Sequence, residues 1–464
     1  MVTAHSASPP PRLPASRGTR PPGPRGRLIL GHTFDYIRDP LAFLTRCARD
    51  HGDIVRLRLG TSTAYLVSHP DLISEVLRTH ATEVIKDELT RLLIPLVGHG
   101  LLTSEGDFWR RQRKLATPAF QHQQIAGYGA TMVDLAQGLS ETWGIAARDG
   151  QPRNVHDDFG ALTLAIVGKT LFGGDVGDAA RRIGPALAQL TEYYLNPYKW
   201  FRIREWLPTR ENRAFRASVR LVDETVYDLI RRRRAQPVEE HRDDLLEGFL
   251  RALDDDGSGM TDAQLRDECV TLFLAGHETT ALALSFVFHL LAHHPEVDER
   301  LAQELESVLG DRPATAADVE RLDYTEAVVR EAMRLYPPAW GIGREAVVPF
   351  TLGGYPVPKG TQLIIAQWVT HRDPRWWTEP EAFRPERWEN DLARRLPRGV
   401  YLPFGDGPRI CIGNHFAMME LILVLATLAR RYRVEPVEGD VLGLIPSITL
   451  RPNGGTRMFV RPRR

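Results

Sequence analysis

The stretch FGDGPRICIG, residues 404–413, is glycine-rich and leads directly into an apolar segment of helical character, Asn414 to Arg430. Cys411 is therefore expected where a tight loop becomes the N-terminus of a helix. Unpaired backbone N–H groups and the positive end of the helix dipole gather at such a position, and both stabilise a thiolate. The glycines permit backbone angles and close contacts that a side chain would forbid. The loop therefore suits a flat cofactor that meets the sulfur of Cys411.

A single cysteine ahead of an apolar helix is more often a small buried hydrophobe than a ligand. The surrounding residues argue against that interpretation here, because they fill every position of the pattern Phe-x-x-Gly-x-Arg-x-Cys-x-Gly with Phe404, Gly407, Arg409, Cys411 and Gly413. This pattern resembles the haem-thiolate signature of the cytochrome P450 superfamily. Three further motifs of the superfamily occur in the expected order, so the resemblance covers most of the chain.

The composition excludes several other classes of protein. The 464 residues carry 59 Lys plus Arg and 59 Asp plus Glu, so the net charge gives no reason to expect a nucleic-acid partner. Apolar residues make up 43%, which is ordinary for a soluble globular protein. The three cysteines, Cys47, Cys269 and Cys411, contain no Cys-x-x-Cys pair, which argues against a structural zinc site and a disulfide scaffold. A reducing cytoplasm fits this cysteine usage best.

The N-terminal region is rich in Pro and Arg and has no apolar core. We expect neither a secretory signal nor a membrane anchor there. Residues 1–26 are predicted to be disordered, with a polyproline turn at residues 21–24, ahead of one domain spanning residues 27–464. No later stretch offers about 18 uninterrupted apolar residues, so no transmembrane anchor is predicted.

Hydrophobic periodicity predicts a mainly α-helical domain with small β-sheets. The predicted helices are Leu41–Asp50, Asp71–His80, Ala126–Ala147, His156–Phe172, Asp178–Leu195, Glu211–Arg234, Thr261–His294 and Tyr324–Tyr336. Strand character is found at Ile54–Leu59, Ala64–Val67, Val357–Ile365 and Ile448–Val460. The ratio of helix to strand, with no internal repeat, favours a single domain of the cytochrome P450 type over a doubly wound α/β fold.

The longest predicted helix begins at Thr261, which forms a capping box with Gln264, and spans about 50 Å, enough to cross the domain. A carboxylate and two hydroxyls interrupt its apolar middle, in the hexapeptide AGHETT at residues 275–280. Buried charge is costly unless it serves a function, although an ordinary buried helix with a satisfied threonine is the simpler alternative. Gly276 and the hydroxyl of Thr279 favour a local widening of the helix.

This hexapeptide resembles the oxygen-binding motif of the family, with Glu278 and Thr279 as its acid–alcohol pair. His277 is interpreted as structural. Trp109 and Arg113 share one helical face, where they suit an anionic haem propionate, and they match the family pattern Trp-x-x-x-Arg.

A charged triad is the remaining motif. Glu331 and Arg334 are three residues apart on one helix, and Arg387 lies downstream in FRPERW, residues 383–388. These residues resemble the triad that braces the haem-side core of the family. Their predicted role is in folding, not in chemistry.

The resemblance implies a haem b cofactor (iron protoporphyrin IX) whose iron is bound by Cys411. It places at the cofactor Trp109, Arg113, Ala275, Gly276, Arg344, Phe404, Gly405, Arg409, Cys411 and Gly413. It places in the substrate pocket Leu272, Phe273, Thr280, Ala339, Trp340, Ile342, Pro446, Ser447 and Ile448. The segments Glu83–Gly106 and Tyr193–Pro208 are expected to cover the substrate, the first with an ordinary surface loop as the alternative.

The activity that the resemblance implies is monooxygenation, which hydroxylates or epoxidises a lipophilic small molecule with O2 and two electrons. A terpenoid, fatty acid, steroid or polyketide of secondary metabolism remains possible. The electrons are expected from a separate ferredoxin and ferredoxin reductase, docked at Arg110, Arg111 and Lys114, and the enzyme is expected to be a monomer. A peroxygenase or isomerase of the same fold, or a non-catalytic haem protein that binds a ligand, is the alternative.

Overall fold

The computed structural model describes residues 20–28, 30–173, 177–195, 207–237, 244–254 and 257–463. The α-helices are α1 (Thr33–Arg38), α2 (Pro40–His51), α3 (Pro70–Ser74), α4 (Glu88–Arg91), α5 (Ile94–Val97), α6 (Gly106–Ala116), α7 (His122–Asp149), α8 (Val155–Phe172), α9 (Gly177–Leu195), α10 (Arg210–Ala235), α11 (Leu245–Arg251), α12 (Asp262–His293), α13 (Pro295–Leu309), α14 (Asp323–Leu335), α15 (Gln367–Thr370), α16 (Leu392–Arg395) and α17 (Asn414–Ala429). Short 3-10 helices are η2 (Thr117–Phe120), η7 (Ala316–Arg321), η8 (Pro385–Trp388) and η9 (Gly407–Arg409), and η1 (Glu75–Thr79) is a π-helical turn.

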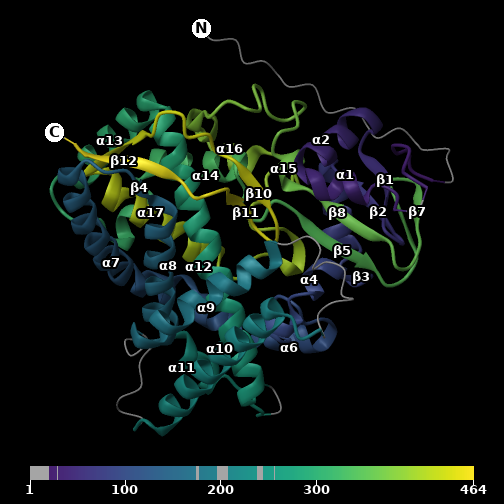
Figure 1. Ribbon diagram of the computed structural model, residues 1–464, viewed down its shortest axis with the longest axis horizontal. Coiled ribbons are helices and arrows are strands. Elements are labelled where there is room, and N and C mark those ends of the chain that lie inside the picture. The colour runs from purple at the N-terminus through teal and green to yellow at the C-terminus, as the bar shows by residue number, and fades with distance from the viewer. Residues whose placement is uncertain are drawn as a thin grey trace.

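The strands are β1 (Ile54–Leu59), β2 (Ser62–Val67), β3 (Val84–Lys86), β4 (Arg153–Asn154), β5 (Ile342–Ala346), β6 (Phe350–Leu352), β7 (Tyr355–Val357), β8 (Gln362–Ile365), β9 (Tyr432–Pro436), β10 (Leu444–Pro446), β11 (Leu450–Pro452) and β12 (Arg457–Pro462). The largest sheet has the order β1-β2-β8-β5-β3, with β2 and β8 parallel and the other pairs antiparallel. Figure 1 shows this sheet at one end of the molecule and most of the long helices at the other. The predicted mainly helical domain with small sheets is confirmed.

Helix α12 is the central element of the helical part. Thr261 caps it, and the predicted capping box with Gln264 is present. The helix packs against α8, α10, α14 and α17, which places it among the other long helices (Figure 1). By length and composition α12 is the one helix in the described ranges that could cross a membrane, but most of it is buried inside the protein. Burial on all sides explains its apolar composition without a bilayer.

Two of the predicted strands are wrong in extent. Residues 357–365 divide between β7 and β8, which belong to different sheets, because the chain turns at Gly360 with φ +84°. Residues 448–460 likewise divide between β11 and β12, since Gly454 and Gly455 both adopt positive φ. A positive φ interrupts an extended strand, and glycine adopts it without steric penalty.

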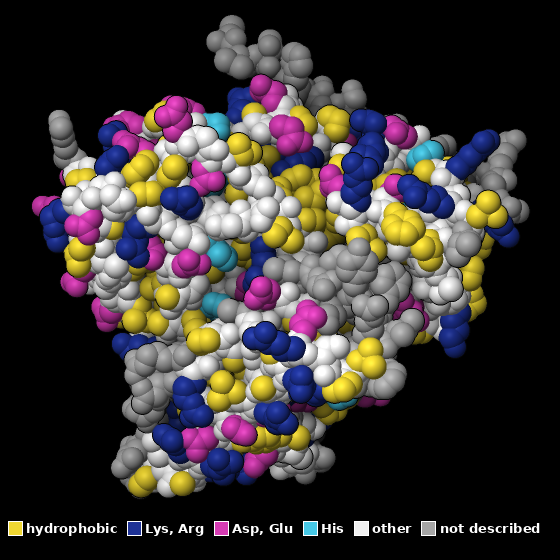
Figure 2. All heavy atoms as spheres, viewed as in Figure 1, with side chains coloured by type: hydrophobic (Ala, Val, Ile, Leu, Met, Phe, Trp, Pro, Cys, Tyr) yellow, Lys and Arg dark blue, Asp and Glu magenta, His cyan; other side chains and the backbone are white. Residues whose placement is uncertain are grey.

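The predicted N-terminal lead-in lies only partly within the described residues, because residues 1–19 are outside them. The Pro22 carbonyl accepts a hydrogen bond from the Arg56 backbone N–H at 2.7 Å, and the Pro24 carbonyl lies 3.1 Å from His32 Nε2. The end of the lead-in is thus tied to β1 and to the start of α1. On the face shown in Figure 2, Lys and Arg side chains are interspersed with Asp and Glu, as the balanced composition predicts.

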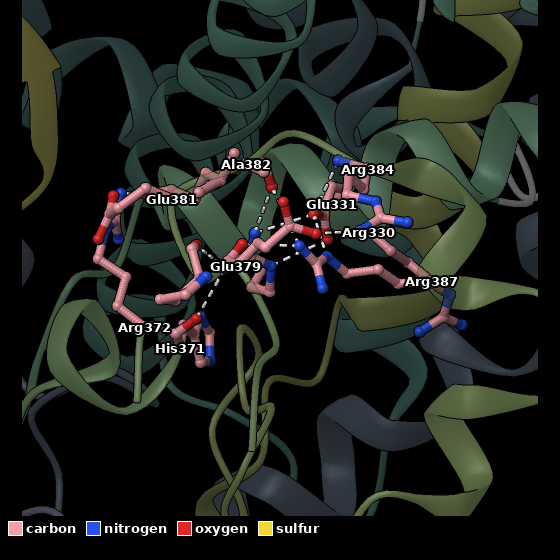
Figure 3. A network of polar contacts seen from close by, with 12 residues as sticks. Arg330, Glu331, His371, Arg372, Glu379, Glu381, Ala382, Arg384 and Arg387 are labelled. Carbon is pink, nitrogen blue, oxygen red and sulfur yellow. Dashed lines mark hydrogen bonds and ion pairs between the residues drawn. The ribbon is translucent and has the colours of Figure 1, made fainter. Parts of the chain in front are cut away.

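The predicted triad of Glu331, Arg334 and Arg387 comes together in the structure. Figure 3 shows the polar network around it, with Glu331 and Arg387 labelled. Arg334 donates two hydrogen bonds to the Glu331 carboxylate, at 2.9 and 2.8 Å, and both side chains are completely buried. Arg387 Nε and Trp388 Nε1 donate to the same carboxylate at 3.0 and 2.9 Å. The buried charges are therefore paired and fully hydrogen-bonded, which buried ions require.

This triad is connected to the cysteine-bearing loop through His371. Arg334 Nη1 donates to the His371 carbonyl at 2.9 Å, and the His371 ring accepts a hydrogen bond from the Leu402 backbone N–H at 3.0 Å. Burial lowers the pKa of His371 to about 3, with a further contribution from Arg334, so the ring is the neutral acceptor that this bond needs. The Leu402 carbonyl in turn accepts from the Gly405 backbone N–H at 3.0 Å. The triad thus supports the backbone from which Cys411 projects.

Candidate functional site

The loop before Cys411 is held in a narrow turn. The Cys411 backbone N–H donates to the Phe404 carbonyl at 2.9 Å, and Gly405 and Gly407 have φ values of +75° and +70°. A Cβ at Gly407 would lie 2.1 Å from the Leu77 carbonyl oxygen, so no other residue fits. Gly413 differs, because its φ is −91° and a Cβ there would make only an ordinary contact. The prediction that Gly413 needs a glycine backbone conformation is therefore wrong.

Cys411 lies deep among protein atoms, yet its side chain is exposed, which places it on the wall of an internal space. Burial raises the pKa of its thiol, whereas a hydrogen bond from the Gly413 backbone and the charge of Arg113 lower it. Gly413 is the N-cap of α17, so its backbone group favours the thiolate as the helix end was predicted to do, although burial outweighs it. A bound metal ion would supply the missing stabilisation, since coordination deprotonates a thiol. Cys47 and Cys269 are buried, and burial raises the pKa of both thiols.

Helix α12 has an exposed position in its middle. Ala275 is exposed, and Gly276 and Thr279 are partly exposed, although the helix around them is mostly buried. The Thr279 hydroxyl donates to the Ala275 carbonyl at 2.6 Å. The segment is α-helical throughout, so the predicted widening is wrong.

Glu278 points away from this exposed position. Its buried carboxylate accepts hydrogen bonds from Thr449 Oγ1 at 2.6 Å and from Arg451 Nε at 2.5 Å, next to strand β11. The acid and the alcohol of the predicted pair are neighbours in sequence but have different partners. Burial lowers the pKa of His277 to about 4, so its ring is neutral. The sequence did not reveal Thr449 and Arg451, which lie more than 170 residues downstream of Glu278.

Three of the predicted cofactor-binding residues form one cationic cluster. Arg409 stacks on the Trp109 ring, with its guanidinium carbon 3.9 Å from the ring centre, and pairs with Glu105. Arg344 is only 6% exposed, and burial lowers its pKa. Burial also lowers the pKa of Arg113, whereas the charge of Cys411 raises it. Among the described residues, no carboxylate lies within ion-pair distance of Arg113 or Arg344.

Lys86 belongs to the same cluster, although it is not among the cofactor-binding residues predicted from the sequence. Strand β3 pairs Lys86 directly with Arg344 of β5. Burial, together with the charges of Arg344 and Arg409, lowers the pKa of Lys86 to about 7. The signal that would have found it is the placement of a lysine in a short, half-buried strand, where a charge needs a partner.

These residues fit the haem that the family resemblance implies. Unpaired buried cations are costly unless an anionic group joins them, and the two carboxylates of a haem would do so. A thiol facing an internal space supplies an iron ligand. The chemistry of the donor set therefore agrees with a haem-thiolate centre.

The predicted pocket residues are distributed over three segments. Leu272, Phe273 and Thr280 are buried in α12, and Phe273 belongs to the main hydrophobic core. Ala339, Trp340 and Ile342 lie after α14, and Pro446, Ser447 and Ile448 lie at the turn between β10 and β11. Trp340 Nε1 donates to the Ser447 carbonyl at 2.8 Å, which joins the second and third of these segments. Of the predicted lid, residues 196–206 lie outside the described residues.

Residues 21–455 match the family model for cytochrome P450. The chain belongs to the cytochrome P450 family. It is 37% identical to cyclooctat-9-en-7-ol 5-monooxygenase of Streptomyces melanosporofaciens, over 95% of this chain and 94% of that protein. Cyclooctatin synthase of the same organism is 36% identical over 95% of each chain. Pentalenene oxygenase of Streptomyces avermitilis is 32% identical over 89% of this chain and 90% of that protein.

Membership in this family makes the protein an oxidoreductase of the monooxygenase class. A cytochrome P450 holds a haem-thiolate cofactor, uses O2 and receives electrons from redox partner proteins. The relatives include bacterial oxygenases of terpenoids.

Proposed function

We propose that this cytochrome P450 hydroxylates or epoxidises a terpenoid, with haem b bound through Cys411 and electrons supplied by a separate ferredoxin and ferredoxin reductase. The named activities of its Streptomyces relatives support a terpenoid over a fatty acid, steroid or polyketide. The proposal depends on the polar side chains around the pocket, because their hydrogen bonds are made within the protein. Trp340, Thr279, Ser447 and Thr449 all donate hydrogen bonds to protein acceptors, which leaves apolar surface for a hydrocarbon-rich molecule. We place the enzyme in the cytoplasm, as a monomer.

Each residue of the site has a defined task in this proposal. Cys411 Sγ holds the iron, while Arg113, Arg344, Arg409 and Lys86 neutralise the two carboxylates of the cofactor. When bound, the haem supplies the chemistry that activates oxygen and oxidises a C–H bond, and electron donation from the thiolate favours O–O cleavage.

The protein itself controls the protons. Thr279, on the exposed side of α12, holds a proton on its hydroxyl beside the Ala275 carbonyl. The Glu278 carboxylate relays protons from the interior once it exchanges its hydrogen bonds with Thr449 and Arg451 for water. This exchange is required because the hydrogen bonds to Thr449 and Arg451 hold the carboxylate away from the exposed side of α12.

A binding screen followed by turnover tests the proposal. Purified holoenzyme is titrated with a set of terpenes, fatty acids, steroids and polyketides, and the shift of the Soret band reports displacement of iron-bound water. The molecules that shift the band are then incubated with O2, NADPH and a surrogate ferredoxin and reductase. A hydroxylated or epoxidised terpene is the expected product. Turnover of fatty acids in place of terpenes would contradict the substrate class, and turnover that needs only hydrogen peroxide would indicate a peroxygenase.

Replacement of Thr279 by alanine is expected to leave substrate binding and reductant consumption near normal, while product formed per electron pair falls several-fold. The substitution keeps a good helix former and a small side chain but removes the hydroxyl at the exposed position. Product, hydrogen peroxide and consumed NADPH are measured together. Thr280→Ala is the matched control, because its side chain points about 100° further around the helix and is buried. Full coupling in Thr279→Ala would contradict the assignment.

The predicted docking patch is partly neutralised in the structure. Arg110 pairs with Asp107, and Asp254 lies 2.9 Å from Arg111 and 3.4 Å from Lys114. Reduction by a ferredoxin is therefore expected to slow only several-fold between low salt and about 0.1 M salt, where the screening length is about 10 Å. Arg110→Glu should slow it further without changing substrate binding. Stopped-flow reduction measures both effects, and rates that are independent of salt would count against electrostatic docking here.

A further inference from the structure

The turn between β10 and β11 makes hydrogen bonds to three other parts of the protein. Within the turn, the Ser447 backbone N–H donates to the Thr449 carbonyl at 3.0 Å. On one side, Thr449 and Arg451 bind Glu278 of α12, in the turn after the exposed Ala275. The Leu450 backbone N–H donates to the Pro338 carbonyl at 2.9 Å. These bonds fix the turn to α12 and to the segment after α14.

On its other side the turn binds the end of helix α9. Ser447 Oγ donates to the Tyr194 carbonyl at 3.0 Å, although 253 residues separate the two. Tyr194 is in the last turn of α9, which ends at Leu195. Ser447 thus connects the last described turn of α9 to the turn between β10 and β11.

Two further bonds extend this connection. Tyr194 itself donates from its phenol oxygen to the Leu92 carbonyl at 3.0 Å, just after the end of α4. Trp340 Nε1 donates to the Ser447 carbonyl at 2.8 Å. Leu92, Tyr194, Trp340 and Ser447 therefore form one hydrogen-bonded series. Leu92 and Tyr194 lie in the two segments expected to cover the substrate, and Trp340 and Ser447 lie in two segments of the pocket wall. The series therefore joins the cover to the wall.

We propose that Ser447 is a positioning residue that fastens the end of α9 to the pocket wall and so limits how fast, and how large, a molecule enters the site. This proposal rests on the proposed function only in placing the substrate beneath these segments. A single neutral hydrogen bond is involved, so its loss should change the population of the open arrangement on the order of three- to tenfold. The change should be specific to bulky molecules, because small ones enter without displacing α9.

Hydrogen–deuterium exchange tests the connection without any ligand. In Ser447→Ala, peptides covering residues 186–195 and 444–452 should exchange on the order of three- to tenfold faster than in the parent protein. Ser447→Thr keeps the hydroxyl and should restore slow exchange. Ser62→Ala, at the start of β2 in a different hairpin, is the matched control and should leave both peptides unchanged. Unchanged exchange of residues 186–195 in Ser447→Ala would overturn the proposal.

Stopped-flow binding of nitrogen ligands to the holoenzyme tests the consequence for entry. Imidazole is the small probe and 4-phenylimidazole is the bulky one, and both are followed by the Soret band. Ser447→Ala should raise the association rate of 4-phenylimidazole on the order of three- to tenfold and leave that of imidazole unchanged. Equal effects on both probes would overturn the size limit. Neither probe requires turnover, so a wrong substrate class would leave these results intact and would appear only in the product screen.

Discussion

Replacement of Cys411 by serine is expected to abolish the red-shifted Soret band of the reduced carbon monoxide complex and to end monooxygenase turnover. The serine hydroxyl is nearly isosteric but does not ionise near neutral pH, so it cannot donate electron density to the iron as a thiolate does. The loop itself should survive, because its conformation depends on Gly405, Gly407 and the bond from the Cys411 backbone N–H to the Phe404 carbonyl. The measurement is the difference spectrum of the dithionite-reduced protein with and without carbon monoxide.

Cys47→Ser and Cys269→Ser serve as controls for this experiment. Both thiols are buried in hydrophobic clusters, so each substitution should cost some stability and leave the band in place. A band that persists in Cys411→Ser and disappears in either control would refute the ligand assignment.

Replacement of Glu331 by alanine is expected to destabilise the protein by about 3–5 kcal/mol and to prevent full incorporation of haem. Arg334 is completely buried and would lose both bonds to its carboxylate partner, which leaves an unpaired cation in the core. The damage should spread to the cysteine loop, because Arg334 holds the His371 carbonyl and His371 holds the Leu402 backbone. Unfolding in urea and the molar ratio of haem to protein measure the two effects.

Arg387→Ala is the informative comparison. Its side chain is 10% exposed, and its removal leaves Glu331 bound to Arg334 and Trp388. We therefore expect a smaller loss of about 1–2 kcal/mol and nearly normal haem content. The sequence motif gives no reason to expect different stability losses from replacing Glu331 and Arg387. In the structure the loss is expected to be larger for Glu331. A Glu331→Ala protein that binds haem fully and only changes its product would show that the triad is not a folding element.

Local spacing in the sequence was sufficient to predict the features whose interacting residues lie within a few positions of one another. The pattern around Cys411, the capping box of Thr261 and Gln264, and the Glu331–Arg334 pair each depend on one loop or one helix, where geometry fixes which side chains meet. The long helix and the mainly helical class followed from periodicity for the same reason. These features identified the family before any tertiary contact was known.

Tertiary structure alone decided the partners that come from distant parts of the chain. Lys86 joins the cationic cluster only because β3 pairs with β5 in a register that sets it opposite Arg344, and Glu278 meets Arg451 only because β11 lies against α12. Ser447 donates a hydrogen bond to α9 across 253 residues. The physical reason is that strand register and helix packing depend on how whole elements bury their apolar faces together, so no local pattern specifies which buried charge or carbonyl will receive which partner.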